Sequence, residues 1–551
     1  MAEPKRVSIG IDIGTTYSSM AYAAVRTSSG FPEPIPQSAT DSTGSRIERQ
    51  FVPSAVCAYV ENGEIKWAVG HNAEEIARDS SKKSHIYRTF KLFLGSSLPE
   101  QDQNISIDGL HIETNPGDLA RKIISYMKDL TFGVNGVLEG YGVSSITVST
   151  PALWTEDRKL YVEDMVRSVF PDVEVRSLEE PISALYHQVN SANHLLSGPE
   201  KYVLVVDYGG GTCDVAVVRI KKNAERLQSE SKRVADVIGR GSIERGGEII
   251  DRIIAREIIG KHNRKHKIKM IPHKLIKEAE ALKISYSNQI QDMRDTSTML
   301  KYEVSYSRNK NYKIQMKKNR FSEILDNELS QINEPITQSL INAGDILGKR
   351  LTHENIRHVF LAGGTTLLPL VKEKIQQIFS QRKTSVSFSS LEPRFAIAYG
   401  NALHAYHNDT GTGFRIGVSL PESIWLKGLG GVGILIAKKG ASLPLEHTEQ
   451  LLLIDRNKDI KVELYRGNNI LVKNDKKIME PIPLSLKKPL GLFPRLKIYV
   501  LIKESGIMDF ELTRVGGDID EKVQVQRRVP VRSDLDEIAE RIGKNLIQED
   551  L

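Results

Sequence analysis

Two stretches of the sequence carry one pattern and decide the fold: VSIGIDIGTTYSSMAYA, residues 7–23, and YVLVVDYGGGTCDVAVV, residues 202–218. Each predicts an apolar strand that ends near an aspartate, a glycine-rich turn and a second apolar strand. The leading aspartates, Asp12 and Asp207, are 195 residues apart, so the repeated unit is a whole lobe and not a solenoid module. We expect two similar lobes that face each other across a cleft.

Strand-to-helix units accompany the two repeats. Residues 146–170 predict a strand, a turn and a helix, with Thr155 as the helix N-cap. A second unit follows at residues 173–189, and a third, at residues 358–379, has a pair of glycines in the turn between its strand and its helix. Because strands and helices alternate along the chain, the sequence predicts an α/β fold.

Changes in local composition and in the hydrophobic pattern predict the domain boundaries. We expect the two lobes to occupy residues 1–407, and less regular, more polar subdomains to be inserted at about 45–116 and 239–320. Residues 409–413 (DTGTG) are rich in structure breakers and predict a linker. The lobes should therefore end just before residue 408.

Beyond the linker the pattern changes from helices to strands. From residue 414 to residue 515, apolar and polar residues alternate in short runs with a period of two. This alternation predicts a small antiparallel β-sandwich. The remaining tail, 516–551, is short and has one helical pattern, at 533–547.

The composition is that of a globular protein. With 551 residues, 40% of them hydrophobic and 26% charged, the chain has room for three or four folding units, which excludes collagen-like and wholly disordered classes. Cys57 and Cys213 form no Cys-x-x-Cys pair, which excludes a cysteine-rich zinc site. We see no signal peptide and no apolar run of membrane-spanning length, so we expect a cytoplasmic protein.

The two turns have the chemistry of a phosphate site. Glycines let backbone N–H groups approach phosphate oxygens, and threonine hydroxyls add donors. Asp12, Asp207 and Asp214 lie at strand ends, where their carboxylates could orient the water ligands of Mg²⁺. One such turn alone is more often an ordinary hairpin, but two copies on matching strands favour the phosphate site. The turn residues are Gly14, Thr15 and Thr16 in the first copy and Gly209, Gly210, Gly211 and Thr212 in the second.

A third turn lies near the end of the lobes. In LAGGTTLLP, the residues Gly363, Gly364 and Thr365 lie between a strand and a helix, where glycine permits close approach of a sugar or base. The nearest match to a Walker A loop, residues 344–350, has the wrong spacing, which disfavours the P-loop class. None of the 13 histidines has the spacing of a zinc hydrolase.

The order of these motifs, with a Glu-Glu-Pro segment between the two phosphate turns, resembles that of the 70-kDa heat-shock chaperone family over residues 5 to about 515. The resemblance implies an actin-like, two-lobed ATPase domain followed by a small antiparallel β-sandwich that binds peptides. It also implies an ATP-dependent molecular chaperone that hydrolyses Mg-ATP in the interlobe cleft and binds extended apolar peptide segments.

The resemblance also implies roles for single residues. The residues implied to be catalytic are Lys91, Glu180, Asp207 and Thr212. The residues implied to hold magnesium, mostly through water, are Asp12, Glu180, Asp207 and Asp214. Pro151 and Lys159 resemble the family's proline switch and its basic relay partner. The residues implied to bind ATP or ADP are Asp12, Gly14, Thr15, Thr16, Gly209, Gly210, Gly211, Thr212, Asp214, Gly247, Glu248, Glu280, Lys283, Gly363, Gly364 and Thr365.

Some positions depart from the family pattern. Ile284 stands where the family stacks an arginine on adenine, and Leu367 and Arg394 replace its usual arginine and aspartate, so the affinity for the base should be weakened or altered. The acidic linker of the family is replaced by DTGTGFRIGV, and about 36 residues follow the predicted sandwich. We therefore expect an atypical member that lacks the helical lid.

The resemblance implies partners as well. Extended or unfolded polypeptides should bind a pocket in the β-sandwich, although simple core packing is the alternative for each of its residues. A J-domain co-chaperone would contact Arg176, and a nucleotide-exchange factor is a further expected partner. The basic stretches 261–274 and 310–320 have one interleaved aromatic, Tyr312, so nucleic acid is disfavoured. The pocket residues would be Leu426, Leu429, Leu451, Leu453, Ile460 and Val462.

Two alternatives remain open at this stage, since one fold hosts several activities. The first is an actin-like ATPase that forms filaments or scaffolds, which would not need a β-sandwich. The second is a kinase of the same fold that phosphorylates a small molecule. Sedimentation with ATP would identify the first, and a phosphoacceptor found among metabolites would identify the second.

Overall fold

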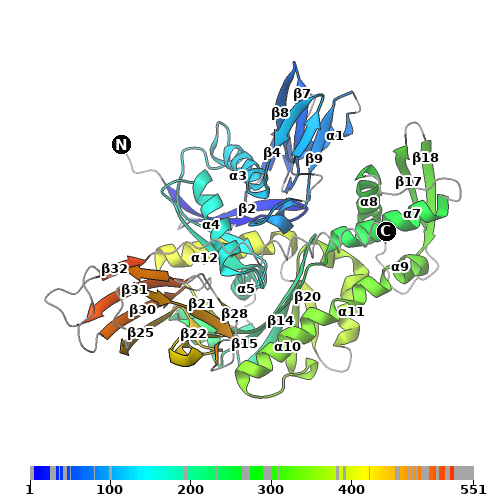
Figure 1. Cartoon of the computed structure of the whole chain (residues 1–551). Helices are drawn as coiled ribbons and strands as arrows, with labels where there is room; N and C mark the ends of the chain where they lie inside the picture. The colour runs from blue at the N-terminus through cyan, green and yellow to red at the C-terminus, as the bar shows by residue number, and fades with distance from the viewer. Residues whose placement is uncertain are drawn as a thin grey trace.

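A computed structural model shows a mixed α/β protein with several sheets, as predicted (Figure 1). Two large sheets, one of six and one of seven strands, form its centre. The structure describes residues 5–24, 33–35, 37–40, 46–49, 51–79, 81–98, 102, 104–191, 195–230, 232–262, 273–289, 299–307, 310–379, 384–388, 393–420, 422–452, 459–467, 471–472, 476–477, 482–485, 495–503, 508–515 and 522–525.

The six-stranded sheet contains the first glycine turn. Its strands β1 and β2 form an antiparallel hairpin around the turn, and β12 runs parallel to β1 on the other side. Both faces of β1 are buried. Val7, Ile9 and Ile11 pack with α3 (Pro116–Phe132) and α4 (Glu156–Val169), and Ser8 and Gly10 lie against α12 (Ala396–Thr410). The strands are β1 (Arg6–Asp12), β2 (Tyr17–Ala23), β3 (Glu33–Pro34), β6 (Val52–Pro53), β12 (Gly142–Thr150) and β13 (Glu174–Glu179).

The seven-stranded sheet repeats this topology around the second turn. Strands β14 and β15 form the antiparallel hairpin, and β19 runs parallel to β14. The repeat in the sequence is thus also a repeat of sheet topology. The strands, in spatial order, are β20 (Ser385–Phe388), β19 (Ile356–Ala362), β14 (Lys201–Tyr208), β15 (Cys213–Ile220), β16 (Arg233–Ile243), β21 (Arg415–Ser419) and β24 (Ser442–Leu443).

Helices α5 (Glu180–Ser191) and α12 (Ala396–Thr410) cross closely between the two sheets. A Cβ on Gly400 would lie 1.6 Å from the carbonyl oxygen of Ser183, so only glycine fits at the crossing. Ser183 donates a 2.6 Å hydrogen bond to Asn401, whose Nδ2 donates to the carbonyl of Ile11 at 2.8 Å. The crossing therefore fixes β1, and with it the first turn, relative to α5.

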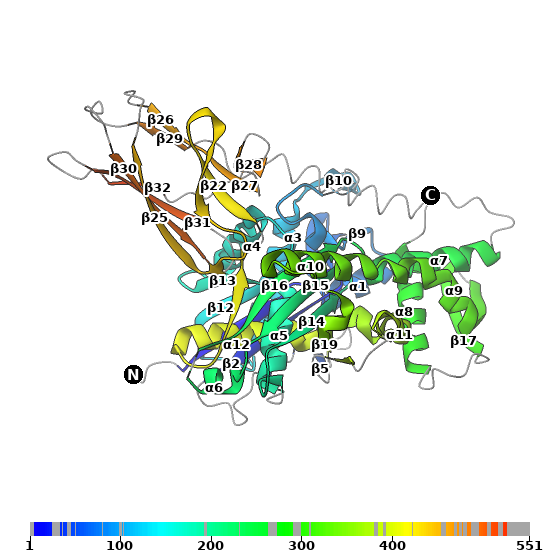
Figure 2. The ribbon, with the colours of Figure 1, turned by 90° about the horizontal axis from the view of Figure 1, so that it is seen from below.

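The remaining helices and strands of the first 400 residues surround these sheets (Figure 2). Thr155 accepts a hydrogen bond from the backbone N–H of Arg158, so the predicted N-cap of α4 is confirmed. The other elements are β4 (Gln37–Thr40), β5 (Arg46–Arg49), β7 (Val56–Glu61), β8 (Glu64–Val69), α1 (His71–Arg78), β9 (Ser84–Tyr87), η1 (Phe90–Phe93), β10 (Asn104–Ile107), β11 (Leu110–Glu113), α3 (Pro116–Phe132), α4 (Glu156–Val169), α6 (Ala224–Ser229), α7 (Gly247–His262), α8 (His273–Gln289), β17 (Met299–Ser307), β18 (Lys310–Lys317), α9 (Lys318–Ser330), α10 (Asn333–Leu347), η3 (His353–Asn355), η4 (Gly364–Leu367), α11 (Pro369–Ile378) and η5 (Pro393–Phe395).

The segment predicted as a linker leads directly into a sheet strand. Helix α12 continues to Thr410 and ends at Gly411, which has a φ of 63°. The next strand, β21, runs parallel to β16. Strands that precede the breaker-rich segment, such as β20, and the strand β21 that follows it therefore belong to one sheet. The domain boundaries at 407 and 414 stay predictions.

The last part of the chain consists of antiparallel strands, as the alternating pattern predicts. Ile498, Val500 and Ile502 of β30 are buried, whereas Lys497 is exposed. Strand β32 continues one sheet past residue 515, and the helix predicted at 533–547 lies outside the described residues. The elements are β22 (Ser423–Lys427), η6 (Leu429–Gly431), β23 (Gly433–Ala437), β25 (Leu445–Leu452), β26 (Asp459–Val462), β27 (Leu464–Gly467), β28 (Lys476–Lys477), β29 (Ile482–Ser485), β30 (Arg495–Ile502), β31 (Met508–Val515) and β32 (Lys522–Val525).

These strands form two four-stranded sheets and one two-stranded sheet. Their buried apolar residues, including Ile424, Leu464 and Val500, belong to one cluster with residues of the seven-stranded sheet. None of the helices in the described part of the chain is both long enough and apolar enough to cross a membrane.

Candidate functional site

A cavity of about 380 Å³ lies where the glycine turns of the two large sheets meet. It brings together most of the residues predicted to bind nucleotide, although they come from segments hundreds of residues apart. Asp214 and Glu248 of the predicted set do not line it. The predicted residues that do line it are Asp12, Gly14, Thr15, Thr16, Lys91, Glu180, Asp207, Gly209, Gly210, Gly211, Thr212, Gly247, Glu280, Lys283, Gly363, Gly364 and Thr365.

The first two turns touch each other. A Cβ on Gly210 would lie 2.2 Å from the hydroxyl oxygen of Thr16, and one on Gly211 would lie 2.5 Å from that of Thr15. Both distances are shorter than a van der Waals contact, so a larger residue at either position would displace the threonine that faces it. The threonine hydroxyls of one turn therefore face the backbone of the other, with both groups at the cavity wall.

The third turn is bonded to the second. Thr365 donates a 2.7 Å hydrogen bond to the carbonyl of Gly209, which also accepts from the backbone N–H of Gly247 at 3.0 Å. Gly363 has a φ of 81°, and a Cβ there would lie 2.4 Å from Oδ1 of Asp207. Glycine is favoured at this position on both grounds, backbone conformation and space.

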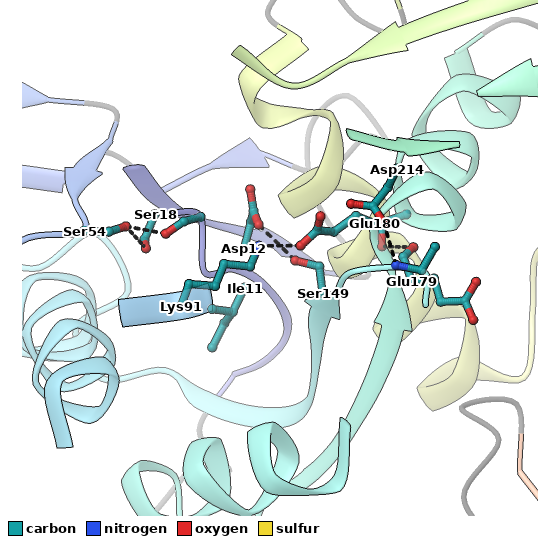
Figure 3. Close-up of polar contacts among 12 residues, drawn as sticks. Ile11, Asp12, Ser18, Ser54, Lys91, Ser149, Glu179, Glu180 and Asp214 are labelled. Carbon is teal, nitrogen blue, oxygen red and sulfur yellow. Dashed lines mark hydrogen bonds and ion pairs between the residues drawn. The ribbon is translucent and has the colours of Figure 1, made fainter. Parts of the chain in front are cut away.

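Four buried carboxylates and one lysine form the polar centre of the site. Lys91, in η1, makes an ion pair with Glu180 at the start of α5 (Figure 3). Ser149 donates to Asp12 at 2.9 Å, and the backbone N–H of Ala152 donates to Oδ1 of Asp214 at 2.9 Å. The carboxylates of Glu180, Asp12 and Asp214 are thus each held by a bond from another element.

Burial and the charge of neighbouring carboxylates raise the pKa values of Asp12, Asp207 and Asp214. Burial, together with the charge of Glu180, raises the pKa of Asp12 to about 6 and that of Asp214 to about 7. The same causes raise the pKa of Asp207 well above its usual value. For Lys91, burial lowers the pKa, but the neighbouring carboxylates outweigh it and the net shift is upward. Lys91 therefore stays charged in the site.

This donor set fits a hydrated divalent cation. Asp12, Glu180, Asp207 and Asp214 are buried near one compensating cation, Lys91, so negative charge is in excess. Among the described residues, no three histidine, cysteine or acidic side chains lie close enough together to hold a metal ion directly. Such an ion would be held mainly through its water ligands, which is how proteins commonly bind Mg²⁺.

We expect Mg²⁺ to raise the melting temperature more near pH 7.5 than near pH 5.5. Asp12 and Asp214 have folded-state pKa values of about 6 and about 7, against 3.8 for an unperturbed aspartate. The folded protein therefore retains protons that the unfolded chain has lost, and its stability without metal falls as the pH rises toward 7. Above that range both carboxylates are charged, and a divalent cation gains most by binding.

Thermal unfolding with Mg²⁺ and with EDTA at the two pH values measures this difference. The variant Asp214→Asn removes one titrating carboxylate at nearly constant volume and should reduce the pH dependence. An equal effect of Mg²⁺ at both pH values would contradict the prediction.

The adenosine-side residues predicted on α7 and α8 are joined by ion pairs. Lys283 lies 2.8 Å from a carboxylate oxygen of Asp251, and it also donates to the carbonyl of Gly247 at 3.2 Å. Glu280 pairs with Lys277 at 2.5 Å. Glu248, by contrast, pairs with Arg252 of its own helix at 3.3 Å. The structure therefore brings Glu280 and Lys283 to the cavity and holds Glu248 behind it.

A buried ion-pair network lies behind the site and was not predicted. Glu179 accepts a hydrogen bond from Lys159 at 3.1 Å and another from Arg240 at 2.5 Å, and Arg240 also donates to the carbonyl of Ser419 at 3.0 Å. Burial raises the pKa of Glu179, but the two cations outweigh it and the net shift is downward. The network joins β13 of the first sheet to β16 and β21 of the second.

The residues predicted for a peptide pocket are spread over several strands. Leu426 is 3% exposed and belongs to the core cluster beneath β22, which agrees with the alternative of simple core packing. Leu429 lies in η6, Leu451 on β25, and Ile460 and Val462 on β26. Leu453 lies outside the described residues. The pocket itself stays a prediction.

Aromatic residues that sequence reasoning missed also line the cavity. Tyr17 follows the first turn directly, and its ring meets that of Phe51 edge-on at 6.4 Å. Phe51 stacks on Phe395 at 4.3 Å. Tyr17 could have been predicted to line the site because it directly follows the first turn. Phe51 could not, because it comes from a segment with no recognisable motif.

Comparisons with known proteins give one consistent result. A family model described as "Hsp70 protein" matches residues 8–548. The "Chaperone protein HscA homolog" of Haemophilus influenzae (strain PittEE) is 24% identical over 484 residues, which cover 85% of this chain and 69% of that protein. The "Chaperone protein dnaK" of Guillardia theta is 21% identical over 565 residues, which cover 98% of this chain and 82% of that protein.

Proposed function

The chain belongs to the Hsp70 family, and from this premise we propose that it is an ATP-dependent molecular chaperone that hydrolyses Mg-ATP in the cavity. The family membership confirms the resemblance drawn from the motifs, and the related HscA and DnaK chaperones support a chaperone role. We further propose that the two large sheets form the two lobes of an actin-like ATPase domain. The last antiparallel strands would form the peptide-binding β-sandwich, and the cytoplasmic location stays a prediction.

One observation supports the ATPase proposal most strongly. Two glycine- and threonine-rich turns on matching hairpins meet at a cavity that also contains a buried lysine among carboxylates. Backbone N–H groups at glycines, hydroxyl donors and a lysine are the groups that bind and position a triphosphate. A filament protein or a metabolite kinase of this fold could share the cavity, but the family match extends beyond it, to residue 548.

In the proposed reaction, water attacks the γ-phosphorus, the bond to the β-phosphate oxygen breaks, and the water proton is lost to the medium or to a phosphate oxygen. Lys91 and the hydroxyl of Thr212 would donate to the oxygens of the transferred phosphoryl group. Asp207, which lines the cavity, would orient the attacking water by accepting a hydrogen bond from it. Asp12, Glu180 and Asp214 would hold the hydrated magnesium ion, which neutralises phosphate charge when bound.

Phosphate release from Mg-ATP tests this function. Hydrolysis should occur without any added acceptor and should cease when EDTA removes the magnesium ion. Transfer to a metabolite would favour the kinase, and ATP-dependent sedimentation without peptide binding would favour the filament protein. Either result would contradict the chaperone proposal.

We expect the substitution Arg176→Glu to abolish stimulation by a J-domain co-chaperone and to leave basal ATP hydrolysis unchanged. The Arg176 side chain is 33% exposed on β13 and pairs at 2.6 Å with Glu174, so its charge is at the surface and outside the cavity. Reversing that charge would repel an acidic partner surface.

Steady-state phosphate release with and without the co-chaperone measures the effect. Arg121→Glu is the matched control, since Arg121 is 37% exposed and also lies in a local ion pair. A variant that is stimulated as strongly as the unmodified protein would remove Arg176 from the contact.

A further inference from the structure

One end of the cavity has apolar walls. Ile284 of α8 is 47% exposed and Leu367 of η4 is 38% exposed, and both line the cavity. Nine large hydrophobic side chains are exposed to this degree among the residues that the structure describes, and these two are the ones at the cavity. A flat apolar ligand would remove both from water, which favours binding.

Most charged groups of the cavity lie on elements other than α8 and η4, which carry Ile284 and Leu367. Lys91 and the carboxylates surround the first two turns, and Lys283 and Glu280, next along α8, are engaged in ion pairs. A triphosphate bound at the turns would therefore leave the apolar end for its base. This step rests on the proposed function, because it assumes that a nucleoside triphosphate is the ligand.

Two polar groups near Ile284 and Leu367, Arg394 and Asn288, are exposed to solvent. Arg394 lies 4.3 Å from the ring centre of Phe51, beside Gly364 of the third turn, and its residue is exposed. Asn288 is exposed as well, while the hydroxyl of Ser287 donates to the backbone carbonyl of Lys283 at 3.0 Å. Water can form hydrogen bonds with Arg394 and Asn288 when the base does not.

We infer that this site binds adenine and guanine nucleotides with little discrimination between them. Strong rejection of a wrong base, by a factor of about 10⁴ or more, requires buried polar groups that the wrong base leaves unpaired, whereas apolar walls discriminate by about 10² at most. Ile284 and Leu367 offer no hydrogen bonds, and both purines have faces that can lie against them. The site therefore takes purine nucleoside triphosphates as a class.

The exposed polar groups are compatible with either base. An arginine donates to acceptors, which guanine presents at O6 and N7 and adenine presents at N7. The amide of Asn288 carries both a donor and an acceptor, so it can pair with the amino group of adenine or with the O6 of guanine. Neither Arg394 nor Asn288 selects one purine.

Dissociation constants for Mg-ATP, Mg-GTP and Mg-tripolyphosphate at one ionic strength test the inference. The constants for ATP and GTP should differ by less than about a hundredfold, and a larger difference in either direction would overturn the inference. Failure of all three ligands to bind would instead contradict the proposed function.

Two variants test whether the base lies at the apolar walls. Ile284→Ala and Leu367→Ala should each weaken ATP and GTP binding about equally, by roughly tenfold, and leave tripolyphosphate binding unchanged. Ile341→Ala is the matched control, because Ile341 on α10 is 53% exposed and does not line the cavity. Unchanged ATP binding in both cavity variants, or an equal loss of tripolyphosphate binding, would overturn the assignment.

Discussion

Replacing Lys91 with alanine should lower single-turnover ATP hydrolysis by at least about tenfold while ATP still binds. Lys91 is 6% exposed and lies among Glu180, Asp12 and Asp207, so in the proposed reaction its charge would lie near the transferred phosphoryl group. Charge develops on that group in the transition state more than in the ground state, so the loss should appear in the chemical step. Thr212→Ala should act in the same way by removing a hydroxyl donor.

Two controls separate catalysis from folding in this experiment. Thr212→Ser keeps the hydroxyl and should retain most of the activity. Because Lys91→Ala leaves buried carboxylates without their cation, a melting temperature that rises on addition of Mg-ADP would show that the variant is folded and binds nucleotide. Near-normal turnover in both alanine variants would contradict the assignment of the cavity as an ATPase site.

Removing the buried cation Arg240 should cost about 3–5 kcal/mol of the free energy of unfolding, because Glu179 would remain buried without one of its two partners. Arg240 is 4% exposed and bonds Glu179 and the carbonyl of Ser419, so Arg240→Ala loosens both β13 and β21. Chemical denaturation of the variant measures the loss.

The matched control and the pH dependence make this result specific. Arg226→Ala removes an arginine that is 80% exposed and paired with Glu230, and should cost less than about 1 kcal/mol. The net downward shift in the pKa of Glu179 means that the network stabilises the protein above the unfolded pKa of 4.5, and that this contribution is lost as the pH falls through the folded value. Equal losses in the two variants would contradict the account.

The sequence predicted the parts of the site that depend on local pattern. The two hairpins around the glycine turns follow from apolar runs and turn residues, and the structure shows both hairpins with antiparallel pairing. Lys91 is different, because a lone lysine has no local signature and only the resemblance singled it out. Its burial depends on η1 packing against α3 and on the ion pair with Glu180 of α5, and both are tertiary contacts.

The network around Glu179 could not be predicted from sequence. Glu179 and Arg240 are 61 residues apart on strands of different sheets, and nothing local marks them as partners. Strand β21 is a similar case. The glycine-rich residues before it predict a linker, but its pairing with β16 depends on which edge of the sheet is free to accept a strand. The resemblance implied a peptide pocket for Leu426, with core packing as the alternative, and its burial in the core cluster depends on tertiary packing that no local pattern reveals.

The proposed function implies that ATP in the cavity would control peptide binding by the last strands. A labelled extended apolar peptide, added first with Mg-ADP and then with Mg-ATP, tests the nucleotide site, the peptide site and their coupling in one measurement. The account predicts binding in the micromolar range with ADP, on the order of −8 kcal/mol or weaker, and faster release when ATP replaces ADP. Peptide binding that is absent with both nucleotides, or identical with both, would contradict it.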